Sequence, residues 1–152
     1  MQLTNIARDV LEDAEMGRRY LPTSWTGDIS PERIIIAAKN PTCDDAVVIT
    51  NAVELLLNMA ERFYESGAKG FKQLYWRAHM SIAIAAKVYR QIGIQLKNKN
   101  YVWYEGRQVT SRTSKLVCSL RAICGLIKRF GRRKHEHNSN LHKPLRGLPY
   151  VT

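Results

Sequence analysis

The sequence predicts an all-α protein. Apolar residues recur at intervals of three and four along several stretches, helix start and stop signals bound these stretches, and no stretch shows a convincing strand pattern. The chain has 152 residues, which is enough for one domain with a core of its own.

The first half of the chain begins with two predicted helices. The first is expected over residues 3–16, because Gly17 and the following "YLP" end it. A loop with Trp25 and Gly27 comes next. Ser30 and Pro31 then mark the start of a short helix to residue 39, since serine caps free amides and proline suits the first helical position.

Two long amphipathic helices follow, over residues 45–66 and 73–97, and glycines in "SGAKG" are expected to close the first. The core stripe of the first comprises Ile49, Val53, Leu56, Ala60 and Phe63. That of the second comprises Leu74, Ala78, Ile82, Ala85, Tyr89, Ile92 and Leu96. After a loop, residues 113–128 have the pattern of a last helix, and residues 129–152 are basic, aperiodic and expected to be disordered.

The charge of the chain predicts an anionic partner. The net charge is +11, and the basic excess is concentrated near the C-terminus, which suits a diphosphate, a nucleic acid or an anionic lipid surface. Three cysteines without a paired motif favour a reducing cytosol. No apolar run reaches the roughly 18–20 residues of a membrane span, so we expect a cytoplasmic protein with at most peripheral contact to an anionic membrane.

Asn5, Asp9 and Asp13 follow one another at intervals of four, which places them on one face of a helix. Two like charges at this spacing destabilise an isolated helix by roughly 0.2–0.5 kcal/mol, so a compensating partner is expected. Mg²⁺ is one candidate, because it binds one or two carboxylates together with water and phosphate oxygens. The alternative is an exposed helix whose acidic residues are balanced by neighbouring arginines, and the spacing alone favours this alternative over a metal site.

The stretch "QLTNIARDVLEDAEMGRRYLP", residues 2–22, resembles the second aspartate-rich motif of the phytoene and squalene synthase family. The matching positions are Gln2, Asn5, Arg8, Asp9, Asp13, Gly17, Arg18, Tyr20 and Pro22. A looser likeness extends through residues 61–92 and 100–116, and the phytoene synthase branch is the most similar in style.

The resemblance implies an isoprenoid synthase-type helical bundle and a head-to-head prenyl transferase of carotenoid biosynthesis. Such an enzyme condenses two prenyl diphosphates, here geranylgeranyl diphosphate, and releases diphosphate with the help of Mg²⁺, or alternatively Mn²⁺. By this resemblance Asn5, Asp9 and Asp13 bind the metal, and Asp9, Asp13 and Tyr20 are catalytic. The implied substrate-binding residues are Gln2, Arg8, Arg18, Tyr89 and Arg107, although Gly106 stands where the family usually has a second arginine beside Arg107.

The family carries two aspartate-rich motifs, and this chain shows one. The sequence "CDDAVV" at residues 43–48 follows the motif and lacks its third carboxylate, so Asp44 and Asp45 are interpreted as N-terminal caps of a helix. We therefore expect residues 1–128 to be the C-terminal half of such a domain. Its uncovered apolar faces predict self-association or a need for a complementing N-terminal half.

Two other functions remain as alternatives. One is a noncatalytic remnant or assembly half, because the first motif is absent. The other is a basic nucleic-acid-binding helical module, which the charge allows but which lacks a recognition helix, a zinc finger or an aromatic RNA-binding signature. Nucleic acid is therefore the less favoured partner.

Overall fold

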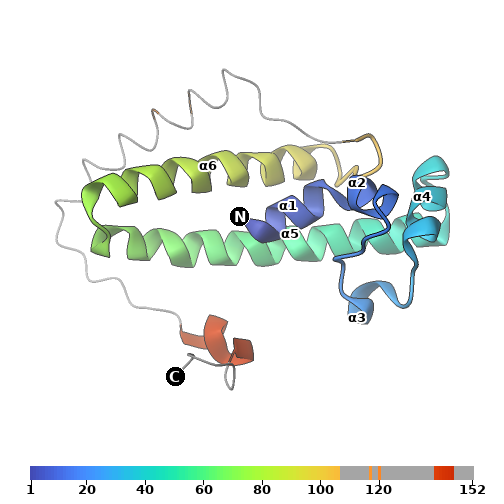
Figure 1. Ribbon diagram of the computed structural model, residues 1–152, viewed down its shortest axis with the longest axis horizontal. Helices are drawn as coiled ribbons and strands as arrows, with labels where there is room; N and C mark the ends of the chain where they lie inside the picture. The colour runs from blue at the N-terminus through green and yellow to red at the C-terminus, as the bar shows by residue number, and fades with distance from the viewer. Residues whose placement is uncertain (107–116, 118–119, 121–138, 146–152) are drawn as a thin grey trace.

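The computed structural model describes residues 1–106, 117, 120 and 139–145. Its elements are α1 (Gln2–Arg8), α2 (Val10–Glu15), α3 (Thr23–Thr26), α4 (Pro31–Lys39), α5 (Asp44–Gly70), η1 (Phe71–Gln73), α6 (Trp76–Asn98) and η3 (Ser139–Leu145). Helices α5 and α6 form a long antiparallel hairpin, with α1 between them and α2 and α4 near the start of α5 (Figure 1). The described residues form helices and turns without strands, which confirms the all-α prediction.

The core lies where α5 meets the other helices. Four of the five predicted stripe residues of α5 are buried, against side chains that include Ala7 of α1, Ile34 of α4 and Leu96 of α6. Phe63, the fifth, is 40% exposed, so its predicted burial is wrong. In α6 the buried residues are His79, Ala83, Ile92 and Leu96, so of the predicted stripe only Ile92 and Leu96 are buried.

The predicted end of α5 at residue 66 is four residues too early, since the helix continues to Gly70, the last residue of "SGAKG". Glycine costs a helix about 1 kcal/mol relative to alanine but does not forbid it. The chain turns only in η1, and Leu74 is then extended, so that α6 begins at Trp76 rather than at residue 73. The position at which α5 ends is therefore set by the hairpin turn and not by the first glycine in the sequence.

The predicted single helix over residues 3–16 is bent at Asp9, whose φ of −103° and ψ of 18° separate α1 from α2. The hydrogen-bond ladder survives, because the Asp9 amide donates to the Asn5 carbonyl at 2.9 Å and the Asp13 amide donates to the Asp9 carbonyl at 2.8 Å. Gly17 ends α2 as predicted. With φ at +70° it allows the Gly17 amide to donate to Ala14 and the Arg18 amide to donate back to Asp13, a Schellman motif.

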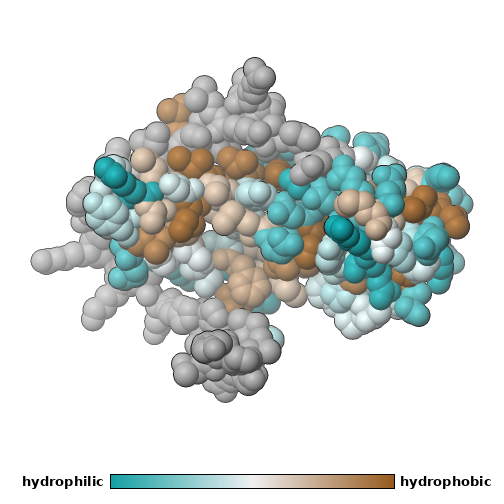
Figure 2. Space-filling model, viewed as in Figure 1, coloured by the Kyte–Doolittle hydropathy of each residue, from teal (hydrophilic) through white to brown (hydrophobic). Residues whose placement is uncertain are grey.

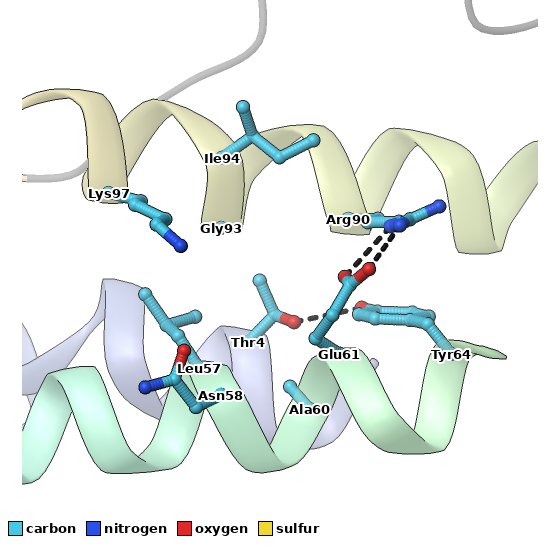
Figure 3. A pocket seen from close by; sticks show the side chains of 10 residues that line it. All are labelled: Thr4, Leu57, Asn58, Ala60, Glu61, Tyr64, Arg90, Gly93, Ile94 and Lys97. Atoms are coloured by element: carbon cyan, nitrogen blue, oxygen red, sulfur yellow. Dashed lines mark hydrogen bonds and ion pairs between the residues drawn. The ribbon is translucent and has the colours of Figure 1, made fainter. Parts of the chain in front are cut away.

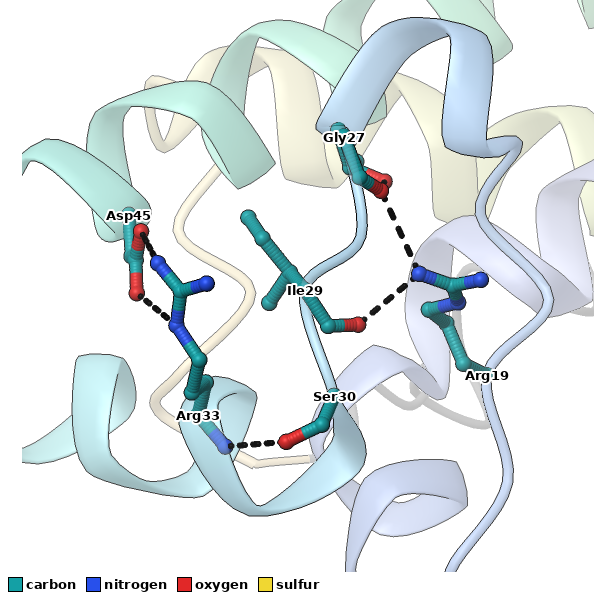
Figure 4. A network of polar contacts seen from close by, with 7 residues as sticks. Arg19, Gly27, Ile29, Ser30, Arg33 and Asp45 are labelled. Atoms are coloured by element: carbon teal, nitrogen blue, oxygen red, sulfur yellow. Dashed lines mark hydrogen bonds and ion pairs between the residues drawn. The ribbon is translucent and has the colours of Figure 1, made fainter.

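A network of polar contacts holds the α3–α4 region against α5 (Figure 4). The guanidinium of Arg19 donates to the Ile29 carbonyl at 2.9 Å, and Ser30 caps α4 through the Arg33 amide, as its sequence predicts. Arg33 also forms a two-bond ion pair with Asp45, at 2.7 and 3.0 Å. Asp45 therefore lies in the first turn of α5 without acting as a side-chain cap, which corrects the interpretation of Asp44 and Asp45, because Cys43 holds the N-cap position.

Apolar side chains remain exposed along the hairpin. On α5 Leu55, Met59 and Phe63 follow at intervals of four and lie on one face, and Figure 2 shows further apolar side chains gathered along α6. The exposed residues are Val47, Leu55, Met59 and Phe63 on α5 and Trp76, Ile82 and Ile94 on α6. These surfaces agree with the expectation of uncovered helix faces.

Several predictions fall on other parts of the chain. The helix expected over residues 113–128, apart from residues 117 and 120, and Arg107 lie outside the described residues. Within the basic segment 129–152, Ser139–Leu145 forms a 3-10 helix, and the remainder also lies outside them. In the described part of the chain, no helix combines the length and the apolarity that crossing a membrane requires.

Trp103 provides a test of this core. Its side chain is 1% exposed, and its indole N–H donates to the Thr50 hydroxyl at 3.1 Å. We expect Trp103→Ala to lower the free energy of unfolding by about 3–5 kcal/mol, because it opens a large cavity. Trp76→Ala, at a side chain that is 46% exposed, should cost much less. Urea unfolding of both variants measures the difference, and equal losses would contradict this assignment of the core.

Candidate functional site

The aspartate-rich motif is presented by two short helices whose inner face is buried. Residues on that face recur at intervals of three and four and pack against the core, namely Thr4, Ala7, Val10 and Ala14. Asn5, Asp9 and Asp13 are partly exposed and occupy the adjoining flank. The sequence thus folds so that these three oxygen-bearing side chains lie beside the buried stripe, at the edge of the core.

Asp9 is held by its own neighbour. The Arg8 guanidinium donates to both carboxylate oxygens of Asp9, at 2.6 and 2.5 Å, and the two side chains are only 10% and 19% exposed. Successive residues on a regular helix do not face each other, so this contact accompanies the bend at Asp9. The hydrogen bonds to Asp9 raise the pKa of Arg8 further, and Arg8 stays a cation at every accessible pH.

Asp13 has an environment that disfavours its charge. Partial burial raises the pKa of the Asp13 carboxyl, and the negative charge of Asp9 raises it further, while Arg18 and Arg8 offset part of the effect. The Schellman turn brings Arg18 back toward this carboxylate through the bond from the Arg18 amide to the Asp13 carbonyl. A cation near Asp9 and Asp13 would relieve the remaining repulsion.

Asn5 contributes a third oxygen. Its side-chain Oδ1 is buried and has no hydrogen-bond partner among the described residues. A buried carbonyl oxygen without a donor costs about 1–3 kcal/mol, so a ligand for it is expected. One amide oxygen and two carboxylates are hard donors of the kind that Mg²⁺ and Mn²⁺ prefer.

The three oxygens are of the types that bind Mg²⁺, but they include only two carboxylates. Within the described ranges, no group of three or more histidine, cysteine, aspartate or glutamate side chains is arranged to hold a metal ion. Mg²⁺ nevertheless fits the three oxygens, since it commonly takes one or two protein carboxylates and completes its octahedron with water and phosphate oxygens.

The other predicted site residues in the described part of the chain are Gln2, Arg18, Tyr20 and Tyr89. Arg18 and Tyr20 line a small hollow of about 10 Å³ together with Asp13, and Tyr20 is 52% exposed. Tyr89 on α6 is half-buried and near enough to Arg8 to influence its pKa. Gln2 is exposed at the start of α1. The structure therefore groups Tyr89 with Arg8 and groups Arg18 and Tyr20 with Asp13.

A cavity of about 220 Å³ behind α1 was not predicted from the sequence (Figure 3). It lies between α5 and α6, and Thr4 of α1 points into it. The Tyr64 hydroxyl lies 2.8 Å from the Thr4 hydroxyl, and Arg90 forms a two-bond ion pair with Glu61 across the two helices. The sequence signal that could have indicated this cavity is Thr4, a polar residue on the core-facing side of the first helix, directly before Asn5.

Comparisons with known proteins point to one family. The family described as squalene/phytoene synthase matches residues 1–115. The chain is 37% identical to 15-cis-phytoene synthase of Enterobacter agglomerans over 116 residues, which are 76% of this chain and 38% of that protein. It is also 37% identical to phytoene synthase of Pseudescherichia vulneris over 129 residues, 84% of this chain and 40% of that protein.

A further relative is phytoene synthase of Rhodobacter capsulatus, 37% identical over 118 residues, 76% of this chain and 33% of that protein. The chain thus spans about two fifths or less of the length of these curated relatives. No solved structure matches it significantly.

The raised pKa of Asp13 predicts how the stability of the fold depends on pH. Because its pKa is raised in the folded state, the ionised carboxylate destabilises the fold once the pH rises above the ordinary value of 3.8. In metal-free buffer at pH 7, Asp13→Asn should therefore raise the thermal unfolding midpoint, and this gain should vanish below about pH 3.8. Differential scanning calorimetry across this range measures it.

The matched control is Asp28→Asn, because the Asp28 side chain is fully exposed and lies 3.6 Å from Arg19. It should leave the midpoint nearly unchanged. A lower midpoint for Asp13→Asn at pH 7 without metal would show that Asp13 is stabilised by its surroundings, contrary to the structure.

Proposed function

Because the chain belongs to the squalene/phytoene synthase family, we propose that it supplies one part of the metal and diphosphate site of a head-to-head prenyl transferase of carotenoid biosynthesis. The observation that supports this most directly is the flank of α1 and α2, where three hard oxygen donors lie beside arginine side chains. The proposed substrate is a prenyl diphosphate, geranylgeranyl diphosphate in particular.

In this proposal Asn5, Asp9 and Asp13 hold Mg²⁺, with Mn²⁺ as a substitute. A divalent cation bound there would neutralise the charge that develops on the departing diphosphate. Arg8 and Arg18 bind phosphate oxygens, since a guanidinium donates two parallel hydrogen bonds to such groups. The anchoring of the inner face of α1 and α2 in the core keeps these side chains on one flank.

Arg8 has two roles in this scheme. Without substrate it occupies both oxygens of Asp9, and in that arrangement it competes with a metal ion for the same carboxylate. A diphosphate offers the guanidinium an alternative anion of higher charge. We infer that diphosphate binding draws Arg8 away from Asp9 and so makes Asp9 available to the metal.

Further roles are proposed for residues around this flank. Tyr20, on the exposed side of the hollow beside Asp13, is a candidate for contact with the diphosphate. Tyr89 and Gln2 are proposed to face the substrate, and Arg107 is proposed to bind it from the loop after α6. A cytoplasmic location with peripheral contact to anionic membranes stays a prediction that rests on the basic segment 129–152.

We also propose that activity requires a further part of the family domain, beyond the 152 residues of this sequence. The donor set is partial within the described residues, the curated relatives are more than twice as long, and apolar faces of α5 and α6 are exposed. A complementing half with its own aspartate-rich motif would supply further ligands and cover these faces. Association of two copies of this chain is the other arrangement that could cover them.

The competition at Asp9 is testable with Arg8→Gln. In the absence of diphosphate, Mn²⁺ should bind this variant about fivefold more tightly than the wild type, because roughly 1 kcal/mol of repulsion between the Arg8 guanidinium and the metal ion is removed. With inorganic pyrophosphate present, the variant should bind Mn²⁺ and pyrophosphate together more weakly than the wild type. Electron paramagnetic resonance of Mn²⁺ measures both.

Arg62→Gln, at an exposed position of α5, is the control. It should change the Mn²⁺ affinity neither with nor without pyrophosphate. Weaker Mn²⁺ binding by Arg8→Gln without pyrophosphate would refute the proposed competition.

The function itself is tested by complementation. We expect no hydrocarbon product when the chain alone is incubated with geranylgeranyl diphosphate and Mg²⁺, and product when the remaining part of the Enterobacter agglomerans relative is added. Asp9→Asn in this chain should reduce the restored activity at least about 100-fold, as the loss of a metal ligand does. A stable complex of the two parts that yields no product would favour the alternative of a noncatalytic assembly half.

A further inference from the structure

Helix α1 depends on anchors other than those of α2. It has seven residues, too few for a stable helix by itself. The bend at Asp9 separates it from α2, which packs against α4, whereas α1 packs against α5 and α6. The direction in which Asn5 points is therefore decided by what holds α1 on the α5–α6 hairpin.

One polar contact holds the N-terminal turn of α1. The Thr4 side chain is fully buried, and its hydroxyl lies 2.8 Å from the hydroxyl of Tyr64, which stands 60 residues later on α5. Figure 3 shows the Tyr64 ring reaching along the cavity to Thr4. Because Thr4 directly precedes Asn5, this contact lies next to the orphaned Asn5 oxygen.

Two further features border the contact between Thr4 and Tyr64. The ion pair between Glu61 and Arg90 joins α5 to α6 one turn before Tyr64, so the two helices are tied at the same end of the cavity. At Gly93 a side-chain carbon would come within 3.2 Å of Leu57 and 3.8 Å of Thr4. The absence of a side chain there lets α6 lie close behind Thr4, which leaves the methyl side of the threonine packed and its hydroxyl directed to Tyr64.

We propose that Tyr64 is a positioning residue, which sets the rotation of α1 through Thr4 and thereby directs the side chain of Asn5. The link to metal binding rests on the proposed function, whereas the link to the orientation of Asn5 does not. Tyr64 has no role of its own with the substrate in this proposal. Its effect is exerted across the thickness of α1, from the cavity side to the flank that carries Asn5 and Asp9.

The test uses Tyr64→Phe and Thr4→Val in the full chain, each of which removes a hydroxyl with little change of shape. Nuclear magnetic resonance of the native state records the chemical shifts of the Asn5 side-chain amide, which report the surroundings of that group. Tyr104→Phe is the matched control, because Tyr104 is half-buried and its hydroxyl makes no hydrogen bond within the described part of the chain. Thermal unfolding of all variants is measured in parallel.

We expect the Asn5 amide signals to move in Tyr64→Phe and in Thr4→Val, to similar new positions, and to stay in place in Tyr104→Phe. The double variant should show the same Asn5 signals as either single variant, since each substitution removes the same hydrogen bond. Unchanged Asn5 signals together with a lower unfolding midpoint would overturn the proposal, because they would show that the contact only stabilises the fold.

Mn²⁺ affinity provides a second readout. If the wild type binds Mn²⁺, Tyr64→Phe should weaken binding about 2- to 10-fold, the range expected from one lost hydrogen bond, and unchanged affinity would overturn the link to the metal. If the wild type binds no Mn²⁺, the proposed function fails, and the Asn5 signals still decide whether Tyr64 positions α1.

Discussion

The burial of the inner face of α1 against the α5–α6 hairpin is the constraint on which the candidate site depends. Helix α1 is too short to persist in water by itself, so its geometry is that of the surface on which it lies. Thr4 and Ala7 are fully buried on that surface, and Asn5 and Asp9 are consequently turned to the flank. The long hairpin thus supports the short helices, which carry the proposed site.

The electrostatics of the flank follow from placing two carboxylates on one side of a bent helix. Arg8 neutralises Asp9 locally, which leaves Asp13 as the carboxylate whose charge is least compensated, and the buried oxygen of Asn5 has no donor. A cation bound beside these side chains would offset the negative charge of Asp13. This is the state expected of one part of a binding site that awaits a metal ion, a diphosphate and further ligands.

Local patterns in the sequence predicted the features that depend on neighbouring residues. The spacing of Asn5, Asp9 and Asp13 places them together in any helix, and Gly17 ends that helix because only its conformation closes the Schellman motif readily. Features that depend on packing were not predictable in this way. The bend at Asp9 accompanies an unusual contact between adjacent side chains, and the continuation of α5 to Gly70 depends on the hairpin turn.

The contact between Thr4 and Tyr64 joins residues that are 60 positions apart, and the sequence contains no periodic signal for it. The same limit explains why Phe63 was assigned to the core. Its spacing matches the stripe of α5, but burial requires a partner helix, and none covers it in the described part of the chain.

The most direct test of the account is a titration of the full chain with Mn²⁺ in the presence of inorganic pyrophosphate, beside the variant Asn5→Leu. The account predicts about one bound Mn²⁺ per chain and a clear loss of affinity in Asn5→Leu, because an amide oxygen is replaced by an apolar group of similar size. Equal binding by the two proteins would contradict it, since the acidic stripe alone would then account for any metal that binds.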